Sequence, residues 1–582
     1  MAEEKKYPFE SDAKYLIHTD DALRGRDFRL AMDNGMEIRI HITDGETLEW
    51  RLLDGPLHWE KYGCLAAGDD IYFLAAVLGG TECPTCITLV LDVKNRLVTM
   101  LKSVLGKYPK RPRLVDVQAF FGAIRMPNEA LPYKRHGFTR DMVGKKVIWH
   151  YSGGFVNMHI YNTERTVRAR SLVRIPGMNP VNWVPGQEYY PGIPHDDLLY
   201  EEPSLCIRIR EGVYLFSFVE DNMNRVDPSA GGNNLVFLAD FANGVDAGRT
   251  FSMGKTGKLE HGFFRAYCEM DTSGEQYPEE LDPSPYIVNT KEENYPAFVP
   301  QEEAAAPPEE PSGRRRYLAF SHNGIAGNSY HLTFDRLPDA YLRFTGDNRV
   351  LYAEEGEPLQ EYHCDCFRAD EDVWLAMFLR DNRCYSFVLD AFNRLVTLVV
   401  TAEEPFRQGL CTEQFYFGAI VCAGEPLPFR RHGFTAEVVG RKFCWHYSPY
   451  VNITHCYVSE HYMRSSLHNM QPLPPDAAKE AVDDVVSRNQ RWGNIFFEEP
   501  AEFVKINPHL YLTVITEKTR NRIDPMEGGG DMLYLVNLRR KRNYGRGYTI
   551  VNGAGFYNLI SVACDFDEKD VPFAKEKSPY LM

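Results

Sequence analysis

The stretch RHGFTRDMVGKKVIWHYSGGFVNMHIY, residues 135–161, decides the fold, because the chain repeats it at residues 431–457 as RHGFTAEVVGRKFCWHYSPYVNITHCY. A period of this length indicates duplication of a whole folding unit, since solenoid repeats run only about 20–50 residues. Five polar or aromatic residues within or just after the stretch recur 296 positions later: His150 and His446, Tyr151 and Tyr447, His159 and His455, Tyr161 and Tyr457, Arg168 and Arg464. These shared positions are where we look for chemistry.

The duplication covers nearly the whole chain. LDVKNRLVT at 91–99 corresponds to LDAFNRLVT at 389–397, and FFGAI at 120–124 corresponds to YFGAI at 416–420. Between the halves, residues 297–316 are rich in Pro, Glu and Ala and predict an extended, solvated linker. At about 100–200 residues per domain, the chain is expected to hold four domains and one linker. Their predicted bounds are 7–125, 126–296, 297–316 (the linker), 317–421 and 422–582.

Composition excludes several classes of protein. The net charge of −16 and the lack of a basic stripe argue against a nucleic-acid partner. The first residues hold no apolar signal core, and no apolar run approaches the ~20 residues of a membrane span. We therefore expect a cytoplasmic protein with no membrane partner, and leave its oligomeric state open. Thirteen scattered cysteines fit free thiols better than disulfides.

Two cysteine clusters, Cys83–Cys86 and His363–Cys366, resemble halves of zinc sites. They lie at non-equivalent places in the two halves, and neither has a second ligand pair at the spacing of a zinc finger. Buried free thiols are the better interpretation, and no metal or cofactor is expected. The sequence also lacks a phosphate loop, a dinucleotide fingerprint and a serine nucleophile elbow.

Short strands dominate the predicted secondary structure. Segments such as MEIRIHI and VYLFSFV alternate or run apolar over five to eight residues between turn-forming residues. Strands spaced by about ten residues and joined in sequence predict an up-and-down meander or barrel. One helix is expected, at residues 474–491, where the first half instead has a Pro-rich aromatic loop.

The repeated residues resemble a known family. GKKVIWHYS, the following FVN, and the His, Tyr and Arg after it are similar to the C-terminal domain of the MoaF family, and the front of each half resembles the MoaF N-terminal domain. More weakly, the back segment resembles bacterial phenolic acid decarboxylases. The decarboxylase resemblance implies lipocalin-like (calycin) barrels. Together with the strand rhythm and the duplication, it leads us to expect a mainly β fold of antiparallel β-barrels, arranged as two tandem repeats of a two-barrel unit.

The decarboxylase resemblance also implies site residues. Tyr151 and Tyr447 match a tyrosine that helps to hold the substrate carboxylate, and Glu220 and Glu517 match a glutamate that exchanges a proton. The chain departs from the pattern elsewhere: Trp149 and Trp445 replace a tyrosine, His159 and His455 replace a glutamate, and Asn182 before Trp183 aligns loosely with an arginine.

Strand alternation predicts that Ile148 and His150 face one side of their strand, and Trp149 and Tyr151 the other. A barrel lined by Trp, Tyr, His and an acid suits a flat phenolic or conjugated acid. An enclosed glutamate there would have a raised pKa and could exchange a proton near neutral pH. The residues expected to bind substrate are Trp149, His150, His159, Tyr161, Arg168, Arg225, Trp445, His446, His455, Tyr457, Arg464 and Arg522.

A purely structural role remains an alternative for the same residues. The recurring His and Tyr side chains also fit hydrogen bonds within a core. Arg225 and Arg522 stand at predicted hairpin bends, where Asx hydrogen bonds and glycines explain the local sequence without any function.

Two functions from different classes follow. One is a cofactor-independent lyase, similar to a non-oxidative decarboxylase, or an isomerase, in which Tyr151, Glu220, Tyr447 and Glu517 are catalytic. The other is a non-catalytic MoaF-type protein that binds a small molecule. The first half keeps the aromatic loop and the closer Glu-Gly-Val-Tyr match, so it is expected to be the more active.

Overall fold

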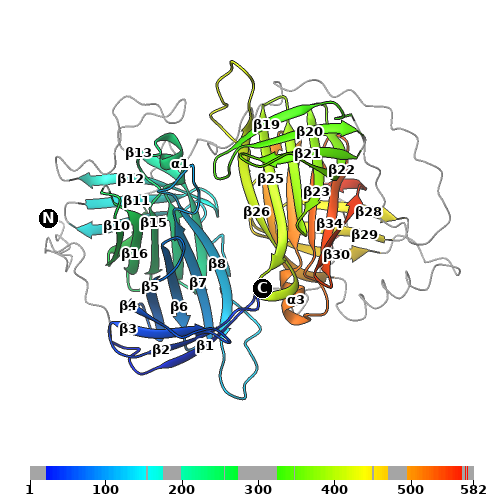
Figure 1. Ribbon diagram of the computed structural model, residues 1–582. Coiled ribbons are helices and arrows are strands. Elements are labelled where there is room, and N and C mark those ends of the chain that lie inside the picture. Colours follow the sequence, from blue (N-terminus) through cyan, green and yellow to red (C-terminus); the bar gives the residue numbers. More distant parts are fainter. Residues whose placement is uncertain are drawn as a thin grey trace. The chain divides into compact units, whose positions relative to one another are not determined.

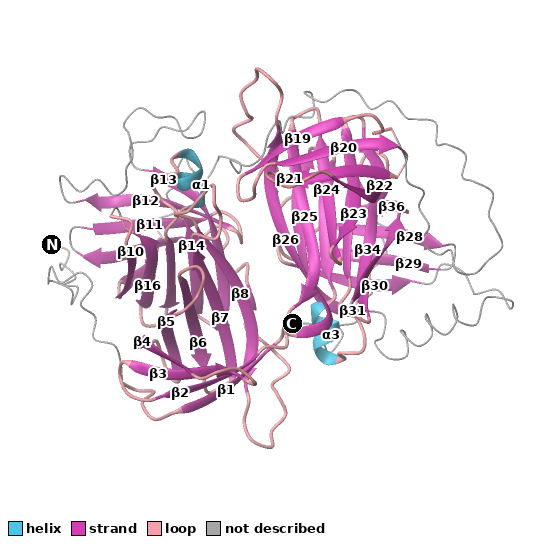
Figure 2. Cartoon of the chain, in the orientation of Figure 1, coloured by secondary structure: helices cyan, strands magenta, loops and turns pink. Residues whose placement is uncertain are grey.

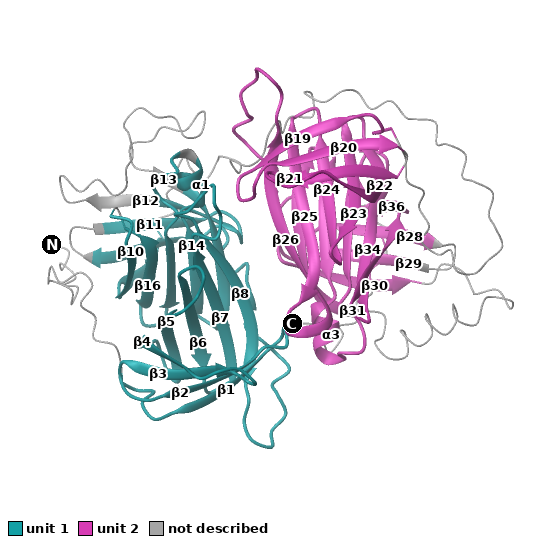
Figure 3. Ribbon diagram, viewed as in Figure 1, with its two compact units in different colours: residues 1–284 teal, residues 285–582 magenta. Residues whose placement is uncertain are grey.

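The computed structural model describes residues 21–152, 155–174, 198–254, 256–272, 324–346, 348–448, 451–468, 495–566, 571 and 573. These residues form antiparallel strands almost throughout, with two short helices (Figure 2). The chain divides into two compact units, Met1–Ser284 and Pro285–Met582 (Figure 3). No helix in the described part of the chain is long and apolar enough to cross a membrane.

Eight strands form the N-terminal barrel of the first unit (Figure 1). They are β1 (Asp27–Met32), β2 (Glu37–Ile42), β3 (Thr47–Leu52), β4 (His58–Ala66), β5 (Ile71–Leu78), β6 (Thr85–Asp92), β7 (Leu97–Leu105) and β8 (Val115–Ile124). Each strand pairs with the next, and β1 closes the ring on β8 with Leu30 opposite Ile124. In β2, Ile38, Ile40 and Ile42 are buried while the residues between them are partly exposed, as a strand with one face in a core requires.

The C-terminal barrel of the first unit follows. Its elements are β9 (Gly137–Phe138), β10 (Lys146–Ser152), β11 (Phe155–Tyr161), β12 (Thr166–Arg174), β13 (Leu198–Arg210), β14 (Val213–Val219), α1 (Asp221–Val226), β15 (Asn234–Asp240), β16 (Val245–Met253), β17 (Leu259–Phe264) and β18 (Tyr267–Met270). Pairing of β10 with β18 and of β12 with β13 closes a ring of eight strands, to which β9 and β17 add at the edges.

The second unit repeats both barrels. Its N-terminal barrel holds β19 (Ser329–Phe334), β20 (Ala340–Gly346), β21 (Arg349–Glu354), β22 (Gln360–Asp370), β23 (Val373–Arg380), β24 (Arg383–Asp390), β25 (Leu395–Glu404) and β26 (Arg407–Ile420). Its C-terminal barrel holds β27 (Gly433–Phe434), β28 (Lys442–Ser448), β29 (Val451–Tyr457), β30 (Tyr462–His468), β31 (Ile495–Asn507), β32 (Leu510–Thr516), α3 (Lys518–Ile523), β33 (Asp531–Asn537), β34 (Arg542–Val551), β35 (Ala554–Ile560) and β36 (Ala563–Phe566). The mainly β, antiparallel, four-barrel fold predicted from the sequence is confirmed.

Within each unit, the two barrels share a hydrophobic core. In the second unit, Leu375 and Val399 of the N-terminal barrel belong to one buried cluster with Leu512 and Leu535 of the C-terminal barrel. Because strand side chains alternate, the same strands β32 and β33 turn Ile515 and Tyr534 to the other face, into the C-terminal barrel. The first unit is built in the same way.

One local prediction needs correction. The segments around Arg225 and Arg522 contain the short helices α1 and α3 rather than a simple hairpin bend. The expected turn features follow the first helix: Asp227 accepts a hydrogen bond from the Ser229 amide at 2.9 Å, and Gly231 has a φ of 62°. The linker at 297–316, the helix at 474–491, the Pro-rich aromatic loop, and Asn182 and Trp183 lie outside the described residues.

Candidate functional site

The alternation of the repeated strand sorts its side chains between the two faces. In β10, Trp149 is fully buried inside the barrel and Tyr151 packs against the same interior cluster. In β28, Trp445 and Tyr447 occupy the equivalent interior positions. The aromatic residues of both strands therefore face the interior of their barrels, as the alternation predicts.

The histidines between them face outward. His150 Nε2 lies 3.1 Å from a carboxylate oxygen of Glu269 on the neighbouring strand β18. His446 Nε2 lies 2.9 Å from Asp565 on β36, and its Nδ1 lies 3.0 Å from Asn452 Oδ1. The structure thus places both histidines in polar contacts on the outer face of their barrels.

The repeated arginines also lie on the outer side of their strands. Arg168 donates from Nε and Nη2 to one oxygen of Glu201, at 2.9 and 2.7 Å, and the two residues are direct cross-strand partners. Arg464 and Glu498 form the same pair at 2.7 Å in the second unit. Strand alternation separates these ion pairs from the interior, where Val167 and Met463 point instead.

A cavity of about 300 Å³ lies inside the C-terminal barrel of the second unit. This volume is at the lower end of the range for small-molecule sites. Its lining residues are Tyr447, Ile453, His455, Met463, Ser465, Phe497, Glu499, Ile515, Glu517, Arg520, Gly530, Asp531, Met532, Tyr534, Gly547, Tyr548, Thr549, Asn558 and Ile560. The predicted residues Tyr447, His455 and Glu517 therefore share one cavity with largely apolar walls.

Two tyrosine hydroxyls meet in the cavity wall. The Oη atoms of Tyr447 and Tyr534 are 3.1 Å apart, and the Tyr534 ring stacks on Trp445 with ring centroids 5.7 Å apart. The stacked tryptophan fixes the position of the Tyr534 ring. In a pair of this kind one hydroxyl donates to the other, which leaves one O–H group able to donate to an oxygen atom of an acid.

His455 is neutral. Burial lowers the pKa of His455 to about 3. The indole Nε1 of Trp445 donates a hydrogen bond to His455 Nδ1 at 2.9 Å. Since an indole is only a donor, Nδ1 is the acceptor and the ring proton of the neutral imidazole lies on Nε2.

Glu517 continues the inward face of β32 beyond Ile515 and stands at the start of α3. One Arg520 Nη lies 3.3 Å from Glu517 Oε1, and the other donates to Glu527 at 2.8 Å. The Glu517 side chain lines the cavity and keeps about a quarter of its surface exposed (26%).

A second glutamate, Glu499, lines the cavity and holds the first turn of α3. Its carboxylate accepts the backbone N–H groups of Thr519 at 2.6 Å and Arg520 at 2.9 Å. These are amides that a helix leaves without an internal partner at its N-terminal end. Burial raises the pKa of Glu499 to about 8, with the nearby Glu517 charge acting in the same direction.

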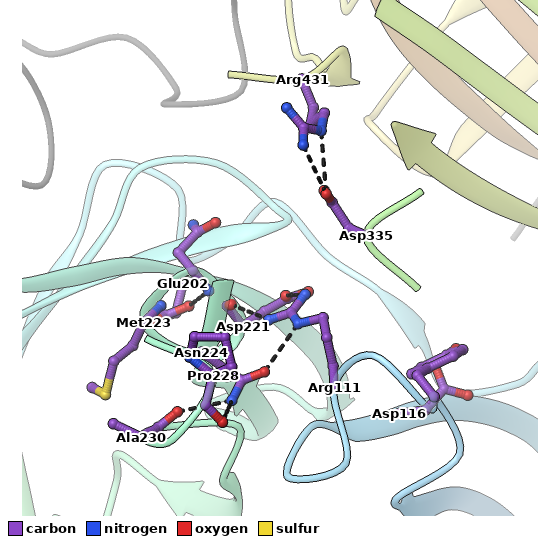
Figure 4. A network of polar contacts seen from close by, with 12 residues as sticks. Arg111, Asp116, Glu202, Asp221, Met223, Asn224, Pro228, Ala230, Asp335 and Arg431 are labelled. Atoms are coloured by element: carbon purple, nitrogen blue, oxygen red, sulfur yellow. Dashed lines mark hydrogen bonds and ion pairs between the residues drawn. The ribbon is translucent and has the colours of Figure 1, made fainter. Parts of the chain in front are cut away.

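The first unit keeps the framework but changes the groups around it (Figure 4). Glu202 accepts the backbone N–H groups of Asn222 at 2.7 Å and Met223 at 3.0 Å, as Glu499 does for α3. Burial raises the pKa of Glu202 well above its usual range. Glu220 accepts a hydrogen bond from Asn233 at 2.6 Å, and burial raises the pKa of Glu220 to about 7.

The interior of the first unit is bulkier and less polar. The equivalent positions in the two units are Phe218 and Ile515, Phe237 and Tyr534, Phe264 and Ile560, and Met223 and Arg520. Phe237 has no hydroxyl to face Tyr151, and the Phe264 ring lies over Gly248, within 2.5 Å of where a Cβ would stand. His159 remains buried, and burial lowers its pKa to about 3.

The remaining predicted residues lie apart from the cavity lining. Tyr161 and Tyr457 are buried in the interior core of their barrels, and burial raises the pKa of both phenols well above the usual range. Arg225 and Arg522 lie on α1 and α3. Within the described ranges, no group of three or more His, Cys, Asp or Glu side chains is arranged to hold a metal ion.

Among the lining residues that the sequence did not predict, three carry a polar group used in the proposals below: Glu499, Arg520 and Tyr534. A signal for Glu499 was present, because Glu-Glu-Pro recurs at 201–203 and 498–500. Arg520 and Tyr534 had no such signal, since Met223 and Phe237 replace them in the first half. Polar groups that only one half carries leave no trace in the comparison of the two halves.

Comparison with known proteins identifies one part of the chain. Residues 9–107 match the family model of the MoaF N-terminal domain, which covers strands β1 to β7. No curated protein matches the chain. A solved structure described as a putative beta-lactamase from Burkholderia vietnamiensis aligns over 23% of this chain and 100% of its own, at 14% identity and a TM-score of 0.15. A similarity this weak carries no argument about function.

Proposed function

We propose that the C-terminal barrel of the second unit binds a small phenolic or conjugated carboxylic acid and exchanges a proton with it through Glu517. The reaction class is that of a cofactor-independent lyase, similar to a non-oxidative decarboxylase, or of an isomerase. The observation that carries the proposal is the shared cavity of Tyr447, His455 and Glu517. A pocket with apolar walls and a few placed polar groups is the usual form of a small-molecule site.

Each group has a role that follows from its position. The hydroxyl pair of Tyr447 and Tyr534 donates its free O–H group to an oxygen atom of the acid, while Ile515 and Met532 contact the flat apolar part of the acid. Glu517 is the proton-exchanging group, because it lines the cavity and a quarter of its side-chain surface (26%) is accessible. A positioned acid or base of this kind contributes about 10²–10⁴-fold to a rate.

A second candidate is a protein that binds the same class of ligand without turning it over. The ion pair between Glu517 and Arg520 favours it, because a carboxylate held by a guanidinium is less free to exchange a proton with a ligand. In this case Arg520 and Glu517 would form a polar rim, and the cavity would serve for capture alone.

A panel of phenolic acids distinguishes the two. The protein is incubated with each acid while the ultraviolet spectrum and released carbon dioxide are followed, and binding is measured separately by calorimetry. Turnover in the wild type and its loss in Glu517→Gln support the lyase. Saturable binding without any product supports the binding protein, and no binding to any acid would reject both.

A further inference from the structure

We propose that Glu413, in the N-terminal barrel of the second unit, is a positioning residue for Glu517 in the neighbouring C-terminal barrel. This inference rests on the function proposed above for the cavity. It assigns a task to the N-terminal barrel, whose described residues contribute nothing to the cavity lining.

Glu413 contacts the residues on either side of Glu517. Its Oε2 accepts a hydrogen bond from the Thr516 hydroxyl at 2.8 Å, and its Oε1 lies 3.4 Å from Lys518 Nζ. The Glu413 side chain is largely buried, with 9% of its surface exposed. Two contacts that bracket one residue restrict the backbone there, and so fix the direction in which the Glu517 side chain leaves it.

Strand geometry explains why both neighbours reach Glu413. Leu512 and Val514 of β32 face the core shared by the two barrels, and Thr516 continues that face. Ile515 faces the cavity, and Glu517 continues the opposite face. A hold on Thr516 from the N-terminal barrel therefore orients Glu517 without entering the cavity.

The connection around α3 is fastened to the same barrel at further points. The Cys411 amide donates to the Gly529 carbonyl at 2.8 Å, and Arg407 donates to the carbonyl of Asn521. Gly529 has a φ of 87°, and a Cβ there would lie 2.4 Å from the Gly409 carbonyl oxygen. Only glycine permits this close approach, so the loop after α3 has little room to shift against β26.

The carboxylate contact is specific to the unit that holds the cavity. The register of β8 and β26 places Val117 of the first unit at the position of Glu413, and Asp221 stands where the second unit has Lys518. In the first unit, Arg111 holds α1 instead, through Asp221 Oδ1 at 2.5 Å and Asn224 Oδ1 at 2.9 Å (Figure 4). The contacts of Glu413 with Thr516 and Lys518 thus occur in the same unit as Arg520, Tyr534 and the cavity.

The test compares Glu413→Val, which copies the first unit, with Glu413→Gln, which keeps an acceptor for Thr516 but loses the charge that faces Lys518. Glu425→Gln is the control. Glu425 lies after the C-terminal end of β26, and its exposed side chain pairs with Arg394. Hydrogen exchange of residues 516–523 reports on α3 without any ligand. Turnover and binding of 4-hydroxycinnamic acid report on the cavity, and thermal melting checks the fold.

We expect Glu413→Val to speed exchange in 516–523 about tenfold or more, and to lower turnover by about 10–100-fold with little change in KM, as for a misplaced catalytic group. Glu413→Gln should recover part of both effects, and Glu425→Gln should change neither. In a Glu517→Gln background, Glu413→Val should cause no further loss of turnover, because the two residues act as one.

Unchanged exchange in a folded Glu413→Val protein would overturn the inference, as would additive losses in the double variant. If Glu413→Val does not fold, Glu413→Gln and Thr516→Val give the same comparison. If 4-hydroxycinnamic acid and the other phenolic acids fail to bind the wild type, the proposed function fails. Exchange alone then decides whether Glu413 positions the start of α3.

Discussion

Glu517 and Glu220 stand at the ends of equivalent strands, but different partners hold them. Glu517 pairs with Arg520 at the cavity, whereas Glu220 is bound by Asn233 beside the apolar Met223. We therefore expect Glu517→Gln to lower turnover by about 10²–10⁴-fold, the contribution of one proton-transfer group. Glu220→Gln should leave most of the turnover intact. This expectation differs from the sequence-based prediction that the first half is the more active one.

Steady-state kinetics of the two single variants and the double variant measure this contrast. Equal losses in Glu220→Gln and Glu517→Gln would show two working sites. Wild-type rates in all three proteins would remove the acid–base role, and the binding protein would then be the better description.

Glu499 makes the stability of the second unit depend on pH. Burial raises its pKa from 4.5 to about 8, so between these values the folded protein keeps a proton that the unfolded chain has lost. The stabilisation is complete below about pH 4.5 and falls as pH rises to about 8, because stability decreases wherever the native state binds more protons than the unfolded state.

Thermal melts of wild type and Glu499→Gln across pH 4.5–8.5 test this dependence. Glutamine keeps an oxygen acceptor for one of the two helix amides but cannot titrate, so the variant should lose part of the decline with rising pH. A wild-type melting temperature that rises steadily across the same window, with an identical slope in Glu499→Gln, would contradict it. Glu202→Gln is the matched change in the first unit, where burial also raises the glutamate pKa.

At the scale of single elements, strands β14, β15 and β17 differ from β32, β33 and β35 mainly in the size of their inward side chains. Phe218 and Phe264 stand where the second unit has isoleucines. Phe218→Ile with Phe264→Ile should open space beside Tyr151, at a cost of about 1–3 kcal/mol of folding stability for each ring, less than a full truncation to alanine. Adding Phe237→Tyr supplies the missing hydroxyl.

Calorimetric titration with 4-hydroxycinnamic acid measures the result. The triple variant should bind close to two molecules per chain where the wild type binds one. The reverse change, Tyr534→Phe, should weaken binding at the existing cavity, because it removes a hydroxyl that Tyr447 contacts at 3.1 Å. An unchanged stoichiometry in a folded triple variant would mean that the rings of Phe218 and Phe264 are not by themselves what separates the two barrels, since Phe216 still stands where the second unit has Thr513.

Much of the element structure follows from the sequence, and the failures have physical causes. Alternation in KVIWHYS correctly separates Trp149 and Tyr151 from His150, because a strand has only two faces. Alternation also places Arg168 on the face opposite to Val167. It shows which of the two residues faces outward only once the structure places Val167 in the interior. The short helices were not predicted, because the backbone N–H groups of their first turn donate to the side chains of Glu202 and Glu499. These glutamates lie on a strand about twenty residues earlier in the chain.

The sequence predicted a cavity shared by Tyr447, His455 and Glu517, but the volume of that cavity was beyond prediction from one sequence. Its volume depends on how side chains from the eight strands β28 to β35 meet, and a single difference such as Phe264 in place of Ile560 alters the space without altering the sequence pattern. Residues shared by both halves describe the barrel common to both. Arg520 and Tyr534, which line the cavity of the second unit, are residues that the two halves do not share.

At the scale of the whole molecule, two compact units with separate hydrophobic cores should unfold in two transitions. A ligand that binds only the cavity of the second unit stabilises that unit alone. At a free concentration 100 times Kd the gain is about 2.7 kcal/mol, which corresponds to roughly 5 °C for a unit of this size.

Differential scanning calorimetry with and without 4-hydroxycinnamic acid tests this, provided that each transition is assigned. Leu215→Ala, in the core shared by the barrels of the first unit, should lower one transition, since truncating a buried leucine costs about 2–5 kcal/mol. Leu512→Ala is the matched change in the second unit and should lower the other. The ligand should raise only the transition that Leu512→Ala lowers. A shift of the transition sensitive to Leu215→Ala would place a binding site in the first unit, and a shift of both would mean that the two barrels bind alike despite their different interiors.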